Sequence, residues 1–202
     1  MVFREPQMLE RACFSTIGPT PICIVRLRRY AMESRTKFLG HPVHPMLIVF
    51  PLGLLATAVA FDIVGLIQHD ANWFRISFWM IAAGIVGGLC AAIFGLVDWI
   101  AIPAGTRGKR IGLLHGATNI LVVLLFIASW FMRKANSEIP SSGALVLSFI
   151  AVTLALAGGW LGGELVDRLG VGVDDGANLN APNSLSHAST IATTDYPVRK
   201  AS

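Results

Sequence analysis

Residues 76–102, ISFWMIAAGIVGGLCAAIFGLVDWIAI, decide the fold that the sequence predicts. This run carries a single charged side chain, that of Asp98. A helix that crosses a bilayer needs about 20 mostly apolar residues, because in lipid each backbone amide must be hydrogen-bonded inside its own segment. The run therefore predicts a membrane-spanning helix with one carboxylate near its end.

Three other apolar runs have a similar character, and the four expected spans are residues 45–67, 76–102, 111–132 and 143–166. The connections between them are short, which favours antiparallel packing of neighbours in the sequence. The sequence thus predicts an all-α, polytopic membrane protein whose residues 38–173 form an up-and-down bundle of four transmembrane helices in the lipid bilayer.

The two ends of the chain differ from the spans. Residues 1–37 are basic, and proline and arginine interrupt their short apolar patch, so no signal-peptide core is expected. Residues 174–202 are rich in Ser, Thr, Asn and Ala and contain few large apolar groups to bury. We expect both segments to be disordered, with Met32 as an alternative translation start.

The composition agrees with a membrane protein and excludes several other classes. Of the 202 residues 54% are apolar and 14% charged, and the mean hydropathy is +0.64. A soluble domain is typically about one quarter charged, so this chain lacks the polar surface of a soluble globule. The same figures exclude a disordered chain, a collagen and a disulfide-bonded secreted scaffold, and the three cysteines form no C-x-x-C pair.

Basic residues are distributed unevenly between the two sides of the expected bundle. Thirteen of the sixteen Lys and Arg residues lie in the N-terminal segment, in the connection at 103–110 or after the last span. The other two connections contain Arg75, Arg133 and Lys134. By the positive-inside rule we expect a multi-pass protein of a bacterial inner membrane with both termini in the cytoplasm. We therefore attribute the net charge of +4 to basic residues on the cytoplasmic side of the membrane, and we expect no nucleic-acid partner.

Small residues form a face on two of the expected spans. The residues of these faces are Gly84, Gly88, Ala91 and Gly95 in the second span, and Gly158 and Gly162 in the fourth. Such faces let two helix backbones approach closely, and we favour packing over the lining of a ligand cavity. In the first span, Pro51 leaves the carbonyl of Leu47 without its helical partner, which predicts a kink.

Polar side chains gather at one end of the expected bundle. They are His44, Asp98, His115, Asn119 and Glu164. An ionised side chain at the centre of a membrane costs about 2.5 to 3.5 kcal/mol on insertion scales, so such residues often mark a site. Asp62 is the exception, because it lies near the opposite end of the first span.

The histidines differ in their local backbone. His115 and Asn119 are four residues apart and share one face of a helix. His41 and His44 each precede a proline in HPVHP, which favours extended geometry and places the two backbones roughly 9 Å apart. His41 and His44 therefore do not form a chelating pair, and a shared ligand also needs His115 or a carboxylate.

We consider three hypotheses for this polar end. In the first, His44 and His115 bind a haem b or a metal ion in an electron-transfer component, with His41 and Asn119 beside the cofactor. In the second, the polar groups form a pathway for protons, ions or a small solute. In the third, the protein is a non-catalytic membrane subunit whose polar groups cap helices and bond one another at the headgroup level.

The two carboxylates have a role in each hypothesis. Asp98 and Glu164 support the histidines in the first and carry protons in the second. In the third, Asp98 pairs with the arginines of 107–110 and Glu164 pairs with Arg168, which contributes about 0 to 1 kcal/mol for each pair. The sequence has no G-x-S-x-G, phosphate-binding loop, H-E-x-x-H or C-x-x-C-H motif, so we expect no conventional enzyme site.

Four stretches of the chain resemble a bacterial membrane family known as domain of unknown function 2231. They are GHPVHPMLIVFPLGLL (40–55), FGLVDWIAIP (94–103), RIGLLHGATN (110–119) and GGWLGGELVDRLGVGV (158–173). The family motifs fall on His41, Pro42, His44 and Pro45, on Asp98 and Trp99, on His115 and Asn119, and on Gly162, Gly163 and Glu164. The resemblance covers residues 38–173 and implies a four-helix inner-membrane protein.

The chain departs from this family at two places. Relatives often have a histidine at the position of Phe50, and they commonly read Tyr-Arg-His where this chain has Asp167, Arg168 and Leu169. These departures remove histidines that a ligation scheme in relatives could use. Some relatives join a Rieske-type iron–sulfur domain, so the resemblance implies electron transfer with a membrane or iron–sulfur redox partner.

Overall fold

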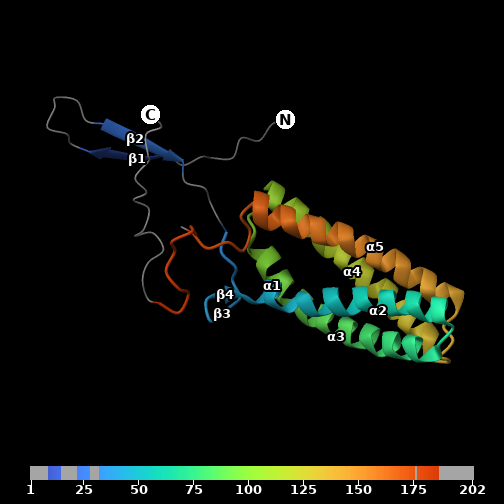
Figure 1. The fold of residues 1–202 in the computed structure, drawn as a ribbon. Helices are drawn as coiled ribbons and strands as arrows, with labels where there is room; N and C mark the ends of the chain where they lie inside the picture. Colours follow the sequence, from blue (N-terminus) through green and yellow to red (C-terminus); the bar gives the residue numbers. More distant parts are fainter. Residues whose placement is uncertain (1–8, 15–21, 28–31, 176, 187–202) are drawn as a thin grey trace, which may run out of the picture.

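The structure is a computed structural model, and it describes residues 9–14, 22–27, 32–175 and 177–186. In this part of the chain short antiparallel strand pairs come first (Figure 1). They are β1 (Leu9–Phe14) with β2 (Ile22–Leu27), and β3 (Lys37–Phe38) with β4 (His41–Pro42). The helices that follow are α1 (Val43–Leu47), α2 (Val49–Gln68), α3 (Ala71–Ala101), α4 (Arg107–Arg133), α5 (Ser142–Gly163) and the π-helix η1 (Glu164–Arg168).

Four helical segments of the described chain are long and apolar enough to cross a membrane. They are Val43–Gln68, Ala71–Ala101, Arg107–Arg133 and Ser142–Arg168. Figure 1 shows α2 to α5 lying side by side along the length of one bundle, and the most extensive contacts join α2 to α3 and α4 to α5. The antiparallel, all-α, four-span bundle that the sequence predicts is confirmed.

The helices α3, α4 and α5 each begin at a capping side chain. The side chains of Asp70, Thr106 and Ser141 accept hydrogen bonds from backbone N–H groups two or three residues further on, at 2.9, 3.1 and 3.3 Å. These N-caps satisfy amides that a helix leaves unpaired at its start. The helices therefore start at residues 71, 107 and 142, before the apolar runs at 76, 111 and 143, because a polar first turn adds no hydropathy.

The middle of the bundle is packed with apolar side chains from α2, α3, α4 and α5. The buried cluster consists of Leu55, Ala58, Val59, Ile81, Ile85, Val122, Phe126 and Ala151. Many large apolar side chains point outward instead, and those of Ile67, Leu156 and Trp160 are 73%, 72% and 69% exposed. An apolar surface of this extent is what the hydrocarbon of a bilayer covers.

The first span is broken at Ile48, between α1 and α2. Pro51 has no amide hydrogen, so it cannot donate to the carbonyl of Leu47 four residues earlier. The interruption lies where the sequence predicts a missing helical hydrogen bond, and the kink itself stays a prediction. Before the interruption the N–H of Ile48 donates to the His44 carbonyl, and after it the N–H of Leu52 donates to the Ile48 carbonyl, both at 3.1 Å.

Two further segments meet at the end of the bundle where α1 begins (Figure 1). We call residues 32–42 the N-terminal strap, and residues 170–175 and 177–186 the C-terminal strap. The N–H of Met32 donates to the Gly170 carbonyl at 3.0 Å, and the N–H of Gly172 donates to the Met32 carbonyl at 2.6 Å. The straps are thus joined by backbone hydrogen bonds.

These contacts lie partly in segments that the sequence assigns to disorder. Residues 32–37 and the described part of the tail are placed by polar contacts, although the sequence assigned them to disordered segments because they bury few apolar groups. Residues 1–8, 15–21, 28–31 and 187–202 lie outside the described residues, so disorder there stays a prediction.

A tight turn lets the two straps touch. Leu39 and Gly40 connect β3 to β4 with positive φ angles of 50° and 84°. A Cβ atom at residue 40 would lie 2.8 Å from the Cβ of Ser184 in the C-terminal strap. Glycine is therefore needed at residue 40 both for the backbone conformation and for the contact.

Candidate functional site

The histidines of two different helices meet at the strap end of the bundle. His44 lies in α1 and His115 in the first half of α4, and their ring centroids are 6.3 Å apart with an interplanar angle of 87°. The planes of the two neighbouring rings are therefore nearly perpendicular. We call His44 and His115 the histidine pair.

Each ring of the histidine pair is oriented by a backbone carbonyl. Nδ1 of His44 lies 2.8 Å from the carbonyl oxygen of Ala91, and Nδ1 of His115 lies 2.9 Å from that of Gly158. Since a carbonyl oxygen only accepts, each Nδ1 must carry the proton that is donated. In a neutral ring this leaves the lone pair on Nε2, which is the arrangement that metal-binding histidines use.

Two glycines make room for the rings. A Cβ atom at residue 95 would lie 2.8 Å from Cε1 of His44, and one at residue 162 would lie 3.2 Å from Cε1 of His115. We expected these glycine faces to bring helix backbones together, whereas at these two positions they accommodate imidazoles from a neighbouring helix. The sequence pattern identifies the faces, but it does not distinguish packing against a backbone from packing against a ring.

Asn119 lies beside His115, as the four-residue spacing predicts. Its Nδ2 donates to the backbone carbonyl of His115 at 2.9 Å and lies 3.4 Å from both ring nitrogens. A Cβ atom at residue 158 would lie 2.8 Å from Oδ1 of Asn119, so Gly158 makes room for this amide. Asn119 therefore packs against the His115 ring.

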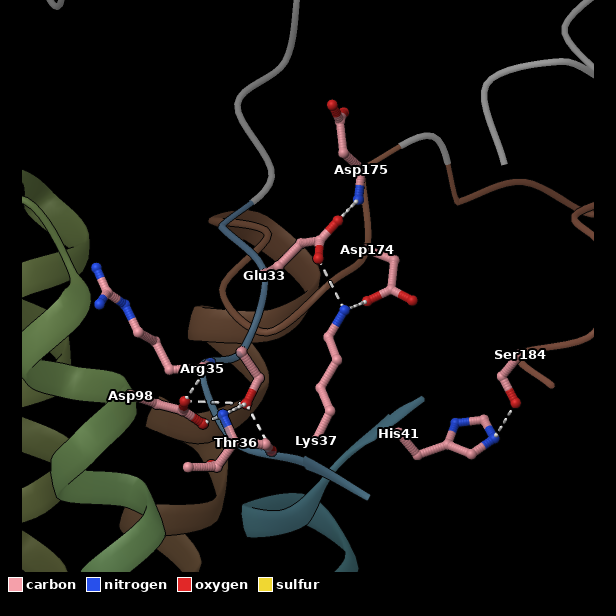
Figure 2. A network of polar contacts seen from close by, with 10 residues as sticks. Glu33, Arg35, Thr36, Lys37, His41, Asp98, Asp174, Asp175 and Ser184 are labelled. Atoms are coloured by element: carbon pink, nitrogen blue, oxygen red, sulfur yellow. Dashed lines mark hydrogen bonds and ion pairs between the residues drawn. The ribbon is translucent and has the colours of Figure 1, made fainter. Parts of the chain in front are cut away.

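His41 lies apart from the histidine pair. It belongs to β4, its side chain is exposed, and its Nε2 lies 3.3 Å from Oγ of Ser184. Figure 2 shows the ring turned toward the C-terminal strap. Among the described residues, no ring contact or hydrogen bond joins His41 to His44 or His115, so the structure does not bring His41 to the pair as the sequence predicted.

The backbone of HPVHP also differs from the prediction. His41 is extended as expected, but His44 lies inside the helix α1 despite preceding Pro45. Proline is tolerated in the first turn of a helix because its missing amide hydrogen has no helical acceptor there. This start places His44 on the helix that packs against α3.

Asp98 holds the N-terminal strap. Its carboxylate accepts from Oγ of Ser34 at 2.8 and 2.9 Å and from the backbone N–H of Arg35 at 2.8 Å (Figure 2). The expected ion pair with the arginines of 107–110 is not among the ion pairs of the described residues. Asp98 therefore fixes a chain segment and does not touch the histidine pair.

Glu164 is paired across two helices. It forms an ion pair with Arg107 at the start of α4, and its side chain is 16% exposed. The expected partner was Arg168, four residues further on. Because Glu164–Arg168 is a π-helix, the residue spacing of an α-helix does not apply there.

A second polar cluster, at the opposite end of the bundle, escaped the sequence analysis. The guanidinium of Arg133 forms two bonds to the carboxylate of Asp62, at 2.8 and 2.7 Å, and both side chains have no exposed surface. The hydroxyls of Ser77, Ser129 and Ser148 also accept from Arg133, at 3.5, 3.2 and 3.2 Å. We call these five residues the buried ion-pair cluster.

The available signal for this cluster was weak. Asp62 stood out as an isolated carboxylate in an apolar run, but Arg133 is the last residue of α4 and was assigned to a connection. A side chain as long as arginine can reach back along its own helix, and the partner lies 71 positions away in the sequence.

The histidine pair offers two side-chain ligands. Among the described residues, no group of three or more His, Cys, Asp or Glu side chains is arranged to hold a metal ion. A metal bound by the pair would therefore take its other ligands from solvent or from the ring nitrogens of a haem.

The fold and the two polar ends define a polytopic membrane protein with a four-helix bundle and a histidine pair at one end. The family model described as "Predicted membrane protein (DUF2231)" matches residues 40–175, and the chain belongs to this family. The matched residues include the histidine pair and all four candidate spans of the described chain. No curated protein and no solved structure matches the chain.

Proposed function

We propose that the protein is an electron-transfer component of the membrane that binds a redox-active metal through Nε2 of His44 and Nε2 of His115. The metal is either a single ion or the iron of a haem b. One observation carries the proposal: both Nδ1 atoms are occupied by backbone carbonyls, which leaves both Nε2 lone pairs for a metal.

The separation of the two rings supports the same proposal. Two imidazoles bound to one metal from opposite sides, with bonds of about 2.0–2.1 Å, have centroids roughly 6 Å apart. The centroids of the histidine pair are 6.3 Å apart. Imidazole suits iron and copper, and either metal can take up one electron from a donor and pass it to an acceptor. The resemblance described above favours a membrane or iron–sulfur protein as that redox partner.

The test is to purify the full chain in mild detergent and to measure its absorbance spectrum and metal content. We expect either a Soret band, which identifies haem, or iron or copper at about one atom per chain. His44→Ala and His115→Ala should each lose the metal, because neither leaves a second imidazole within reach. His41→Ala is the matched control and should keep it, since His41 bonds to Ser184 and lies apart from the pair.

Protein that contains no haem, no iron and no copper above background, and that binds neither added haem nor Cu⁺, would refute the metal proposal. Retention of metal by His115→Ala would refute the assignment of the site.

A proton or ion pathway is the second candidate, and the proximity of two imidazoles beside Asn119 favours it. Adjacent imidazoles can exchange protons when one is charged. In this case liposomes that contain the protein should show a pH-dependent flux that His115→Ala abolishes. Absence of both metal and flux leaves a non-catalytic membrane subunit as the function.

We also propose that the protein lies in a bacterial inner membrane with both termini in the cytoplasm. The distribution of Lys and Arg supports this orientation, because thirteen of the sixteen lie in the two terminal segments and the connection at 103–110. Cysteine labelling tests this orientation. A single cysteine replaces the exposed Ala104 in an otherwise Cys-free chain, and spheroplasts that express this chain are treated with an impermeant maleimide. We expect labelling only after lysis. Labelling in intact spheroplasts would show that the orientation is the opposite of the one proposed.

A further inference from the structure

We propose that α1 is a hinged arm that carries His44, and that the N-terminal strap is the latch that holds this arm so that His44 stays beside His115. Asp98 is then a positioning residue for His44. This inference rests on the proposed function only for the role of the histidine pair in binding a metal.

The hinge lies between α1 and α2. The helix is interrupted at Ile48, and Pro51 cannot donate to the carbonyl of Leu47, so this turn lacks the bond that would stiffen it. Broken helical bonding at a proline is a common site of bending. The arm is therefore joined to the long helix α2 by a turn that lacks a helical hydrogen bond.

The arm itself is short. It contains five residues, and none of them is buried within the protein. On the protein side the arm contacts α3, where the His44 ring lies over Gly95 and donates to the carbonyl of Ala91. Packing alone gives a helix of this length little stability.

The latch is the set of polar contacts made by the N-terminal strap. The N–H of Val43 donates to the carbonyl of Thr36 at 2.9 Å, which ties the start of the arm to the strap. Two positions earlier, Ser34 and the N–H of Arg35 donate to Asp98 at the end of α3. Asp98 therefore anchors the segment that enters the arm.

A second part of the latch joins the two straps. The ammonium of Lys37 lies between Glu33, at 2.8 Å, and Asp174, at 2.7 Å, and Figure 2 shows this bridge between the straps. The side chains of the three residues are 27%, 49% and 41% exposed, so salt can screen their ion pairs. The carboxylate of Asp98, in contrast, accepts from the hydroxyl of Ser34, which is buried, so salt screens these hydrogen bonds less.

Releasing the strap frees the arm to move about the hinge. The His44 ring would then leave Gly95 and lose its fixed orientation toward His115. A ligand that needs both imidazoles would bind when the strap is closed and leave when it opens. The two straps thus control the site without contacting the histidine pair.

Hydrogen exchange measured by mass spectrometry on the full chain in detergent tests the latch. We expect Asp98→Ala to speed exchange in residues 32–47 about tenfold, because charge-assisted hydrogen bonds to the strap are lost. Exchange in α4 and α5 should be unchanged. Asp70→Ala is the matched control: it also removes a carboxylate that accepts a backbone N–H, but at the opposite end of α3, and it should leave residues 32–47 unchanged.

A second variant keeps the test informative if Asp98→Ala is unstable. Lys37→Met removes the half-exposed ion pairs alone, and we expect about a threefold increase of exchange in residues 32–42. In the native chain 1 M salt should produce a similar increase, and in Lys37→Met salt should add nothing.

Measurements of metal affinity distinguish a failure of this inference from a failure of the proposed function. If the native chain binds metal, Asp98→Ala should weaken its affinity about tenfold, while Asp70→Ala, at the opposite end of α3, does not. Unchanged exchange in residues 32–47 of Asp98→Ala, or faster exchange throughout the bundle, would overturn the latch. Faster exchange confined to the arm, in a protein that binds no metal, would support the latch and refute only the metal site.

Discussion

The two polar ends of the bundle use similar residues for different purposes. At one end, the buried ion-pair cluster brings together side chains from α2, α3, α4 and α5, and each of its members is at most 1% exposed. At the other end, the histidine pair is half-buried; Nε2 of His44 has no hydrogen bond among the described residues, and Nε2 of His115 has only the 3.4 Å contact with Asn119. Complete satisfaction of donors and acceptors is typical of structural polar groups, whereas an oriented but uncommitted lone pair is typical of a site.

The guanidinium of Arg133 illustrates a saturated group. Its Nε donates to Ser129, while the two terminal nitrogens donate to Asp62 and to the hydroxyls of Ser77 and Ser148. A buried ion pair contributes little net stability compared with an apolar replacement, but an unpaired partner is costly. The cluster therefore joins side chains from α2, α3, α4 and α5 without an unpaired charge.

The largest expected effect on stability is at the end of the bundle that contains the buried ion-pair cluster. Arg133→Met leaves the Asp62 carboxylate buried without a partner, which should lower the free energy of unfolding by about 3–5 kcal/mol. Thermal unfolding in detergent measures the change. Arg75→Ala is the matched control, because Arg75 pairs with Glu138 at 3.7 Å on the surface and its loss should cost about 0–1 kcal/mol.

The double variant Asp62→Leu with Arg133→Met sharpens this comparison. It removes both charges, so its stability should return to within about 1–2 kcal/mol of the native chain. A double variant as unstable as Arg133→Met alone would show that the cluster contributes more than the avoidance of an unpaired charge.

A smaller effect on stability, but a clear effect on binding, is expected at the histidine end. In Gly95→Ala the new Cβ would lie 2.8 Å from Cε1 of His44, so the ring must shift. We expect at least about a tenfold loss of metal affinity, with destabilisation of about 1–3 kcal/mol from overpacking. Metal titration followed by absorbance measures the first effect.

Gly116→Ala is the control for this substitution. No atom lies within 4 Å of a Cβ built at residue 116, so alanine should stabilise α4 by about 0.5–1 kcal/mol and leave binding intact. Equal binding by Gly95→Ala and Gly116→Ala would mean that the orientation of His44 is unimportant.

The smallest expected effect concerns the straps and depends on pH. The hydrogen bond from Lys37 and the backbone N–H of Asp175 lower the pKa of Glu33 from its usual value of 4.5. A carboxyl group with a lowered pKa stabilises the folded state above its unfolded pKa, and this contribution is lost as the pH falls through the lowered value. Relative to the intrinsic exchange rate at each pH, protection of residues 32–38 should therefore fall on acidification below about pH 4.5, and Glu33→Gln should remove this dependence.

The membrane bundle was predictable because its signal is local. Each span is a continuous apolar run, and the family motifs cover the same residues. The helix ends were less predictable, since they depend on single capping side chains such as Thr106. His44 and His115 were identified as candidates because an imidazole in an apolar run is unusual, and the structure brings them together.

The polar partners were predicted less well because they are separated in sequence. Asp98 bonds to Ser34, 64 positions earlier, and Arg133 bonds to Asp62, 71 positions earlier. Charge counting placed Arg133 in a connection, and spacing gave Glu164 the wrong partner. His41 and His44 belong to the same sequence motif. His41, however, directly follows the tight turn at Leu39 and Gly40 and is extended, so its side chain points toward the C-terminal strap.

The apolar middle of the bundle has a consequence for energy conversion. On α4, about 15 Å of helix separates Asn119 from Ser129, and the buried residues between them, Val122 and Phe126, are apolar. If the histidine pair transfers electrons as we propose, the charge stays on the side from which it came. The proposed reaction is then electroneutral with respect to the bilayer, and a voltage applied across the membrane should neither drive nor oppose it.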